Sequence, residues 1–162
     1  MDNKLHDLFK NIYDHSDQTD MVRVLEEIET NIFNKNINID DYLQNKIPQV
    51  LGKDLKAYIT AQKINIFDAI SLSKFITDIK KELMSLPKLD LYLSFDLSRD
   101  AINMIGQWLN ENMSSKVILR THKNSDLLGG AVVEFNGLRR DYSLNLMLKE
   151  KFNESYGGII NG

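Results

Sequence analysis

The first half of the chain carries apolar residues at the spacing of amphipathic helices. Residues that recur at i, i+3, i+4 and i+7 fall on one face of a helix, so each such stripe predicts a helix with one buried side. The stripes run over 5–13, 21–32, 55–59 and 66–86. The pattern therefore predicts an N-terminal half made of helices that pack through their apolar faces.

Residues with capping or helix-breaking chemistry separate these stripes. Asp17 or Thr19 is the expected N-cap of the second helix, because a short polar side chain accepts hydrogen bonds from the free N–H groups of the first turn. Asp40 and Asp41 can cap a third helix, and Pro48 and Gly52 predict a break or kink before the short helix over 55–59. Pro87 ends the long helix over 66–86, since proline lacks an N–H and disfavours a helical conformation in the residue before it.

The period of the pattern changes after Pro87. A strand over 88–95 is predicted, because four apolar residues alternate there and would share one buried face: Leu89, Leu91, Leu93 and Phe95. Ser98 is the expected N-cap of a following helix. Trp108 is predicted to lie in the core with the other apolar residues of that helix, which are Ile102, Ile105, Leu109 and Met113.

Strand-forming residues and a turn signal occupy the region that follows. Runs over 116–121 and 127–135 predict two further strands. Asn136-Gly137 predicts a two-residue hairpin turn, because both central positions of a type I′ turn need positive φ. A return strand over 138–141 follows, and a last helix is expected to begin near Ser143.

The predicted fold class is α+β, with two domains. The first is an N-terminal α-helical bundle over 1–87, and the second is a small mixed α/β domain over 88–153, in the order strand–helix–strand–hairpin–helix. Residues 154–162, which include Gly157-Gly158, are expected to form a flexible tail.

Composition narrows the class of protein. The 162 residues include no cysteine and carry a net charge of −3, so disulfides and thiolate sites are excluded and nothing favours nucleic acid or anionic lipid as a partner. The opening residues show no apolar stretch of a signal peptide. The longest nearly apolar run, 127–133, is far shorter than the roughly 20 residues of a membrane span. We expect a soluble chain that reaches a membrane only through partners.

The residues that could do chemistry form no known catalytic or metal-binding motif. His6, His15 and His122 lack metal-ligand spacing, and the first two are predicted to lie on the surface. His122, at the end of a strand, stays open as a ligand or general base. Glu26-Glu27 and Asp40-Asp41 are neighbours in sequence and do not face each other on a helix, so solvated surface and helix capping explain them. No catalytic, cofactor-binding or metal-binding residue is predicted.

Two further motifs have ordinary structural explanations. Gly129-Gly130 matches neither a Walker nor a dinucleotide loop, and a tight turn entering a strand explains it. A small nucleotide-binding protein that uses this loop stays an alternative. Arg139-Arg140, Lys149 and Lys151 form a basic cluster, but the strands lack the aromatic signature of RNA-binding sheets, so nucleic acid is not predicted as a partner.

The segment from Ser125 to Ser143 resembles the signature of the ATP synthase delta subunit, whose mitochondrial counterpart is the oligomycin-sensitivity-conferring protein. The family pattern is roughly D-P-S-L-I-G-G, a strand, a turn, and then D-x-S opening a terminal helix. The residues that fit it are Leu127, Leu128, Gly129, Gly130, Asp141 and Ser143. Asn124-Ser125 replaces the family's Asp-Pro, which removes a rigid φ but keeps turn-forming residues.

The resemblance implies a non-catalytic stator subunit of an F-type proton-translocating ATP synthase. By analogy, the helical bundle binds the N-termini of the alpha subunits, and the C-terminal domain binds the C-terminus of the membrane-anchored b subunit. One copy per complex is implied, on the cytoplasmic face of the membrane, or on the matrix or stroma side in an organelle. Because the N-terminal half is short for the family, a stand-alone adaptor that kept this domain is a second alternative.

Overall fold

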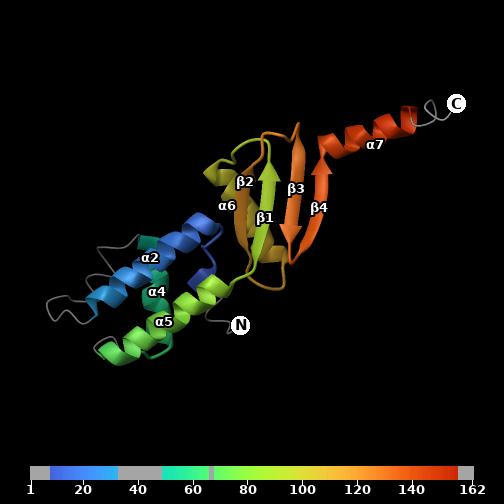
Figure 1. Cartoon of the computed structure of the whole chain (residues 1–162). Coiled ribbons are helices and arrows are strands. Elements are labelled where there is room, and N and C mark those ends of the chain that lie inside the picture. The colour runs from blue at the N-terminus through green and yellow to red at the C-terminus, as the bar shows by residue number, and fades with distance from the viewer. Residues whose placement is uncertain (1–7, 33–48, 66–67, 157–162) are drawn as a thin grey trace.

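The computed structural model describes residues 8–32, 49–65 and 68–156. Within these residues, helices precede a sheet, and Figure 1 shows them beside it, while the last helix extends away from the opposite side. The helices are α2 (His15–Asn31), α4 (Gln49–Ala61), α5 (Ala69–Ser85), α6 (Arg99–Asn112) and α7 (Leu144–Tyr156). The strands are β1 (Lys88–Leu93), β2 (Ile118–Lys123), β3 (Gly130–Phe135) and β4 (Leu138–Ser143). This arrangement confirms the predicted α+β class.

The helical half, residues 8–32, 49–65 and 68–87, encloses one apolar core. The predicted stripes of α2, α4 and α5 face each other in it, and the buried residues include Met21, Leu25, Ile28, Leu55, Ile59, Ile76, Ile79 and Leu83. Burial of apolar surface of this kind is the main favourable term in folding. The start of the first predicted stripe, His6 and the Asp40-Asp41 pair lie outside the described residues.

The ends of these helices correct three expectations. The N-cap of α2 is Asp14, and Asp17 is the acidic partner three residues later in a capping box, so neither Asp17 nor Thr19 is the cap. Gly52 lies inside α4, which begins directly after Pro48, so the break does not reach the glycine. Ile70, which falls in the predicted stripe over 66–86, is 78% exposed, whereas Leu72 in the same first turn of α5 is buried.

The four strands form one mixed sheet in the order β2-β1-β3-β4. β1 and β2 are parallel and are joined through α6, whereas β3 pairs antiparallel with both β1 and β4. The predicted hairpin turn is confirmed, since Asn136 has φ of 50° and Gly137 has φ of 76°. β4 is therefore an edge strand, and its far side has no neighbouring strand within the described part of the chain.

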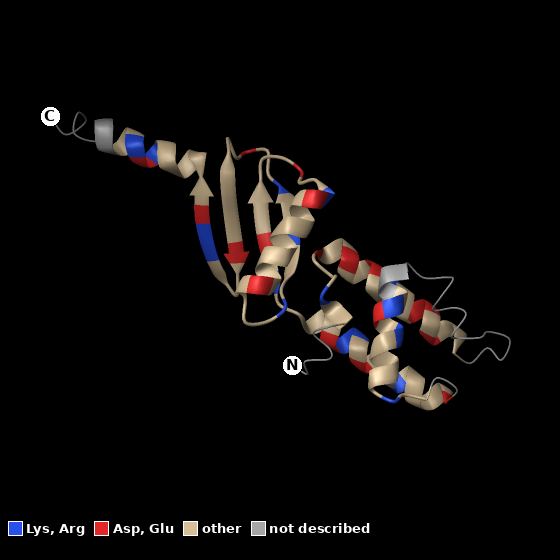
Figure 2. Cartoon of the chain, turned by 180° about the vertical axis from the view of Figure 1, so that it is seen from behind, with Lys and Arg blue, Asp and Glu red and all other residues tan. Residues whose placement is uncertain are grey.

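The two faces of the sheet differ in chemistry. Leu89, Leu91 and Leu93 lie on one face with their register partners on β2 and β3, and α6 lies against this face, behind the sheet in Figure 1. The other face carries Asp90 and Tyr92. Figure 2 shows α6 crossing this face obliquely, while β4 at the edge of the sheet lies clear of it.

Two aromatic residues predicted to be buried are exposed. Phe95 is 56% exposed, because β1 ends at Leu93 and the alternation stops before it. Trp108 is 58% exposed, although Leu109 beside it is buried. A helix that lies on a sheet buries a narrow stripe, and Trp108 falls to one side of that stripe. Periodicity alone gave the helix correctly but assigned too wide a buried face.

The helical half and the sheet half are joined by ion pairs and by close packing. Arg99 at the start of α6 forms ion pairs with Asp14 at 3.1 Å and Asp17 at 2.6 Å. Gly106 of α6 packs so closely on Tyr13 that an added Cβ would lie 2.5 Å from the Tyr13 Cβ. Asp14 also bridges to Leu119, which extends the edge of the sheet into the helical half. We call these residues, together with Lys116, the joint.

Lys116 is the buried cation of the joint. Its Nζ donates to the Lys10 carbonyl at 3.2 Å and to the Asn110 side chain at 2.8 Å, and it lies 5.2 Å from the centre of the Tyr13 ring. Burial lowers the pKa of this amine to about 8, while the charge of Asp17 opposes that shift. The joint thus fixes how the two halves meet. Their behaviour as separate domains stays a prediction.

Candidate functional site

The predicted signature residues meet at the base of α7. Ser143 caps this helix, because its Oγ accepts from the Leu146 N–H at 3.3 Å. Asp141 in turn accepts from the Ser143 N–H at 2.8 Å, and the Ser143 side chain and N–H lower the pKa of the Asp141 carboxyl. The Asp-x-Ser element therefore sets where β4 ends and where α7 begins.

The loop over 124–129 holds the first turn of α7 from the other side. The Gly129 carbonyl accepts from the Leu144 N–H at 2.9 Å. Asn145 links the same turn to the loop twice, since it accepts from the Leu128 N–H at 2.7 Å and donates to the Asp126 carbonyl at 2.9 Å. Asn145 was not singled out from the sequence, although an Asn in the first turn of a helix is a common backbone linker.

Gly130 is the glycine of the pair that the backbone requires. It has φ of 76°, and an added Cβ would lie 2.3 Å from the Tyr142 carbonyl oxygen. Gly129 has ordinary space around it, with its nearest neighbours at 4.0 Å on Leu144. The pair thus brings the chain tightly against β4, as predicted for a turn that enters a strand.

Beyond its base, α7 exposes apolar side chains. It contacts β4 and extends away from the rest of the chain (Figures 1 and 2). The exposed apolar residues along it are Leu144, Leu146, Met147, Leu148 and Phe152. Leu128 at its base is also 69% exposed. A helix that is firmly held at one end and exposes apolar residues along its length has the form of a docking element.

His122 has a carboxylate partner, which the sequence did not reveal. Its Nε2 lies 2.6 Å from Asp90 Oδ1, and Arg120 Nη2 lies 2.5 Å from the other oxygen of the same carboxylate. Although partial burial opposes ionisation of Asp90, the hydrogen bonds from Arg120 and His122 lower its pKa. The three residues meet because β1 and β2 are parallel and in register there.

This polar network continues across the open face of the sheet. Tyr92 stacks on His122 with ring centres 4.7 Å apart, and its hydroxyl lies 3.3 Å from Glu134, which pairs with Arg139. Each charged group in this row has an oppositely charged neighbour. The network stabilises the register of the strands, because it links side chains of all four of them.

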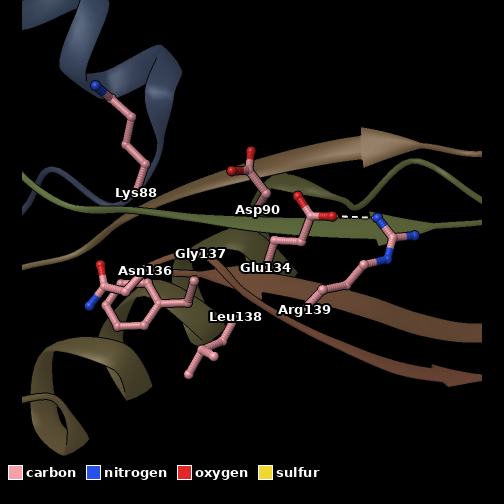
Figure 3. Close-up of a pocket in the computed structure, with 8 residues that line it drawn as sticks. Lys88, Asp90, Glu134, Asn136, Gly137, Leu138 and Arg139 are labelled. Atoms are coloured by element: carbon pink, nitrogen blue, oxygen red, sulfur yellow. Dashed lines mark hydrogen bonds and ion pairs between the residues drawn. The ribbon is translucent and has the colours of Figure 1, made fainter.

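The cavities near these residues are shallow. One of about 360 Å³ lies at the hairpin end of the sheet, and Figure 3 shows Lys88, Asp90, Glu134 and Arg139 around it. Another of about 230 Å³ lies between the start of α2 and β2 and is lined by His15 and His122. Neither of these two cavities is lined by Gly129 or Gly130.

The remaining candidates lie on the surface. Glu26, Glu27, His15 and the basic pair Arg139-Arg140 are exposed. Across the described residues, no three metal-ligating side chains gather where they could hold an ion. No helix in this part of the chain is both long enough and apolar enough to cross a membrane.

The comparisons with known proteins agree with the motif at the base of α7. A family model described as the ATP synthase delta (OSCP) subunit matches residues 3–153, so the match extends through the helical half as well. No curated protein matches the chain. Members of the matched family are structural subunits of the peripheral stalk of F-type ATP synthases. The chain belongs to the ATP synthase delta (OSCP) subunit family.

Proposed function

We propose that this chain is the stator subunit that links the catalytic head of an F-type ATP synthase to the membrane-anchored b subunit. The observation that carries the proposal is α7, which is fixed at its base by Ser143, Gly129 and Asn145 and exposes apolar residues beyond it. A monomer that exposes such a helix loses apolar burial that a partner can restore. The proposed partner of α7 is the C-terminal end of the b subunit.

The helical half is the proposed docking element for the N-termini of the alpha subunits. This assignment follows from family membership, since the matching region includes the helical half. The joint supports it physically: ion pairs and close packing around Arg99 and Gly106 let a force applied to one half reach the other. A stator needs that stiffness, because it holds the head still against the rotating shaft. One copy per complex, at the membrane periphery, completes the proposal.

Binding experiments with purified components test this function. The chain should bind the catalytic head and a soluble segment of the b subunit at once, giving a three-part complex in size-exclusion chromatography. A stop after Ser143 removes α7 but keeps β4 whole, so b binding should be lost while head binding stays. A chain that binds neither component would contradict the proposal.

Point variants on α7 provide a sharper version of the test. Met147→Asp places a charge on the exposed apolar side of α7 and should weaken b binding by tenfold or more. Met84→Asp is the matched control, because Met84 is also an exposed methionine but lies on α5 in the helical half. Equal loss of b binding in both variants would place the b site elsewhere.

A further inference from the structure

The hairpin turn between β3 and β4 presents a chemically reactive pair of residues in an open position. Asn136 and Gly137 are both exposed, and no atom of the described residues lies within 4 Å of the place that a Cβ on Gly137 would take. Figure 3 shows the Asn136 carboxamide turned away from Glu134 and Arg139. The turn therefore leaves this carboxamide, and the backbone N–H that follows it, accessible to water.

The geometry of the turn keeps the Gly137 N–H out of the strand ladder. Phe135 and Leu138 form the last pair of the ladder, so the two turn residues lie beyond it. Their φ values are 50° at Asn136 and 76° at Gly137. Because glycine has no Cβ, the peptide unit between the two residues can rotate with little steric hindrance and bring the Gly137 nitrogen toward the Asn136 Cγ.

Another asparagine of the sheet half is held in place. The Asn124 Oδ1 accepts from the Asp126 N–H at 3.0 Å, and the residue after Asn124 is Ser125 rather than glycine. A carboxamide that takes part in a hydrogen bond is less free to turn toward the backbone. The other Asn-Gly pair, Asn161-Gly162, lies outside the described residues. Exposure and the following glycine thus favour reaction at Asn136 over Asn124.

We propose that Asn136 is a site of spontaneous deamidation. The Gly137 nitrogen, after losing its proton to hydroxide, attacks the Asn136 Cγ, and the Cγ–Nδ2 bond breaks so that the side-chain nitrogen leaves as ammonia. Water then opens the resulting succinimide ring at either carbonyl and leaves aspartate or isoaspartate. The net reaction consumes one water and releases one ammonia, with no change of oxidation state. This inference does not depend on the proposed function.

The isoaspartyl product changes the turn on which β4 depends. It routes the main chain through the Cβ of residue 136, which adds an atom to a two-residue turn whose geometry must match the flanking strands. Within the described residues, β4 is an edge strand that pairs with β3 alone, and it leads into the Ser143 cap of α7. Isoaspartate should therefore loosen the β3–β4 pairing and, with it, the base of α7.

Ageing of the full chain at physiological temperature and mildly alkaline pH tests the site. Trypsin cleaves after Lys123 and Arg139, so Asn124 and Asn136 fall in one peptide, 124–139, whose fragments locate the change. Digestion at mildly acidic pH keeps the reaction from continuing during handling, and electron-transfer fragmentation distinguishes isoaspartate from aspartate. Asn136 should convert several-fold faster than Asn124. Its rate should rise with pH, because the Gly137 nitrogen must lose its proton before it attacks.

Asn136→Gly is the matched control, because a Gly-Gly turn keeps positive φ at both positions and lacks the reacting carboxamide. Hydrogen exchange of the β4 amides should speed up in the aged wild-type chain and stay unchanged in the aged variant. The isolated peptide 124–139, aged alongside, sets the time of incubation. An intact Asn136 in the chain after several half-lives of the peptide would overturn the proposal. Conversion of Asn136 to isoaspartate with unchanged exchange in β4 would overturn the consequence drawn for that strand.

Discussion

The joint between the two halves and the C-terminal end of the molecule differ in how far their side chains find partners within the chain. In the joint, Arg99, Lys116 and Tyr13 all find partners within the chain, and Gly106 allows backbone and ring to touch. On α7 and β4, large apolar side chains such as Leu138, Met147 and Leu148 are exposed. The sheet lies between these two regions (Figure 1).

This difference separates residues that stabilise the chain from residues available to a partner. A buried, satisfied contact contributes to the free energy of unfolding of the isolated protein. An exposed apolar residue contributes little to it and gains its burial only on association. Substitutions in the two regions should therefore affect different measurements.

The largest contrast is expected between two leucines. Leu25 on α2 is fully buried, and Leu25→Ala should lower the free energy of unfolding by about 2–5 kcal/mol. Leu148 on α7 is 39% exposed, and Leu148→Ala should change that free energy by less than about 0.5 kcal/mol. Urea denaturation followed by circular dichroism measures both. Equal effects would show that α7 packs on the chain in solution.

A pH dependence of stability is expected from Lys116. Its pKa is lowered to about 8 by burial in the folded chain, whereas the unfolded chain keeps the ordinary value of 10.5. Unfolding therefore takes up a proton between these values, and stability due to this group rises as pH rises through the window. Relative to the Lys116→Met variant, the free energy of unfolding of the wild-type chain should rise by on the order of 1–3 kcal/mol between pH 7.5 and 10. If the difference in unfolding free energy between the two proteins does not change across this pH range, Lys116 is hydrated in the folded chain.

Close packing at Gly106 predicts that a larger residue at this position destabilises the chain. Gly106→Ala would place its Cβ 2.5 Å from the Tyr13 Cβ, so the two elements must separate. We expect a loss of about 1–2 kcal/mol in unfolding free energy, since overpacking outweighs the better helix propensity of alanine. In a Tyr13→Ala background the same change should be neutral or stabilising. Additive effects of the two substitutions would contradict the contact.

The smallest effect is expected at the cap of α7. Ser143→Ala removes the acceptor for the Leu146 N–H and should cost about 1 kcal/mol, confined to α7. Hydrogen exchange of the α7 amides should speed up while urea unfolding stays almost unchanged. Ser98→Ala, which removes the cap of α6, is the matched control and should shift global unfolding. Global destabilisation by Ser143→Ala would place α7 within the folding unit.

Local patterns predicted most of the secondary structure and the base of α7. The strands, the Asn136-Gly137 hairpin, the Ser98 cap and the region where α7 begins depend on residues close in sequence, so spacing and turn chemistry suffice. The signature around Gly130 and Ser143 likewise has a local geometric cause.

The sequence did not predict features that depend on distant residues. The Asp90–His122 pair follows from the register of two strands, and the joint brings Tyr13 against Gly106. Trp108 was predicted to be buried because helical spacing marks an apolar stripe but not which flank of it meets the sheet.

Reconstitution of the stalk tests the central claim most directly. Catalytic heads stripped of their own delta subunit are mixed with a soluble b segment and with this chain, either whole or ending at Ser143. The whole chain is predicted to bring the b segment onto the head, and the shortened chain to bind the head alone. Bridging by the shortened chain, or no binding of the whole chain to either component, would contradict the assignment of α7 and β4 as the side of the molecule that binds the membrane-anchored stalk.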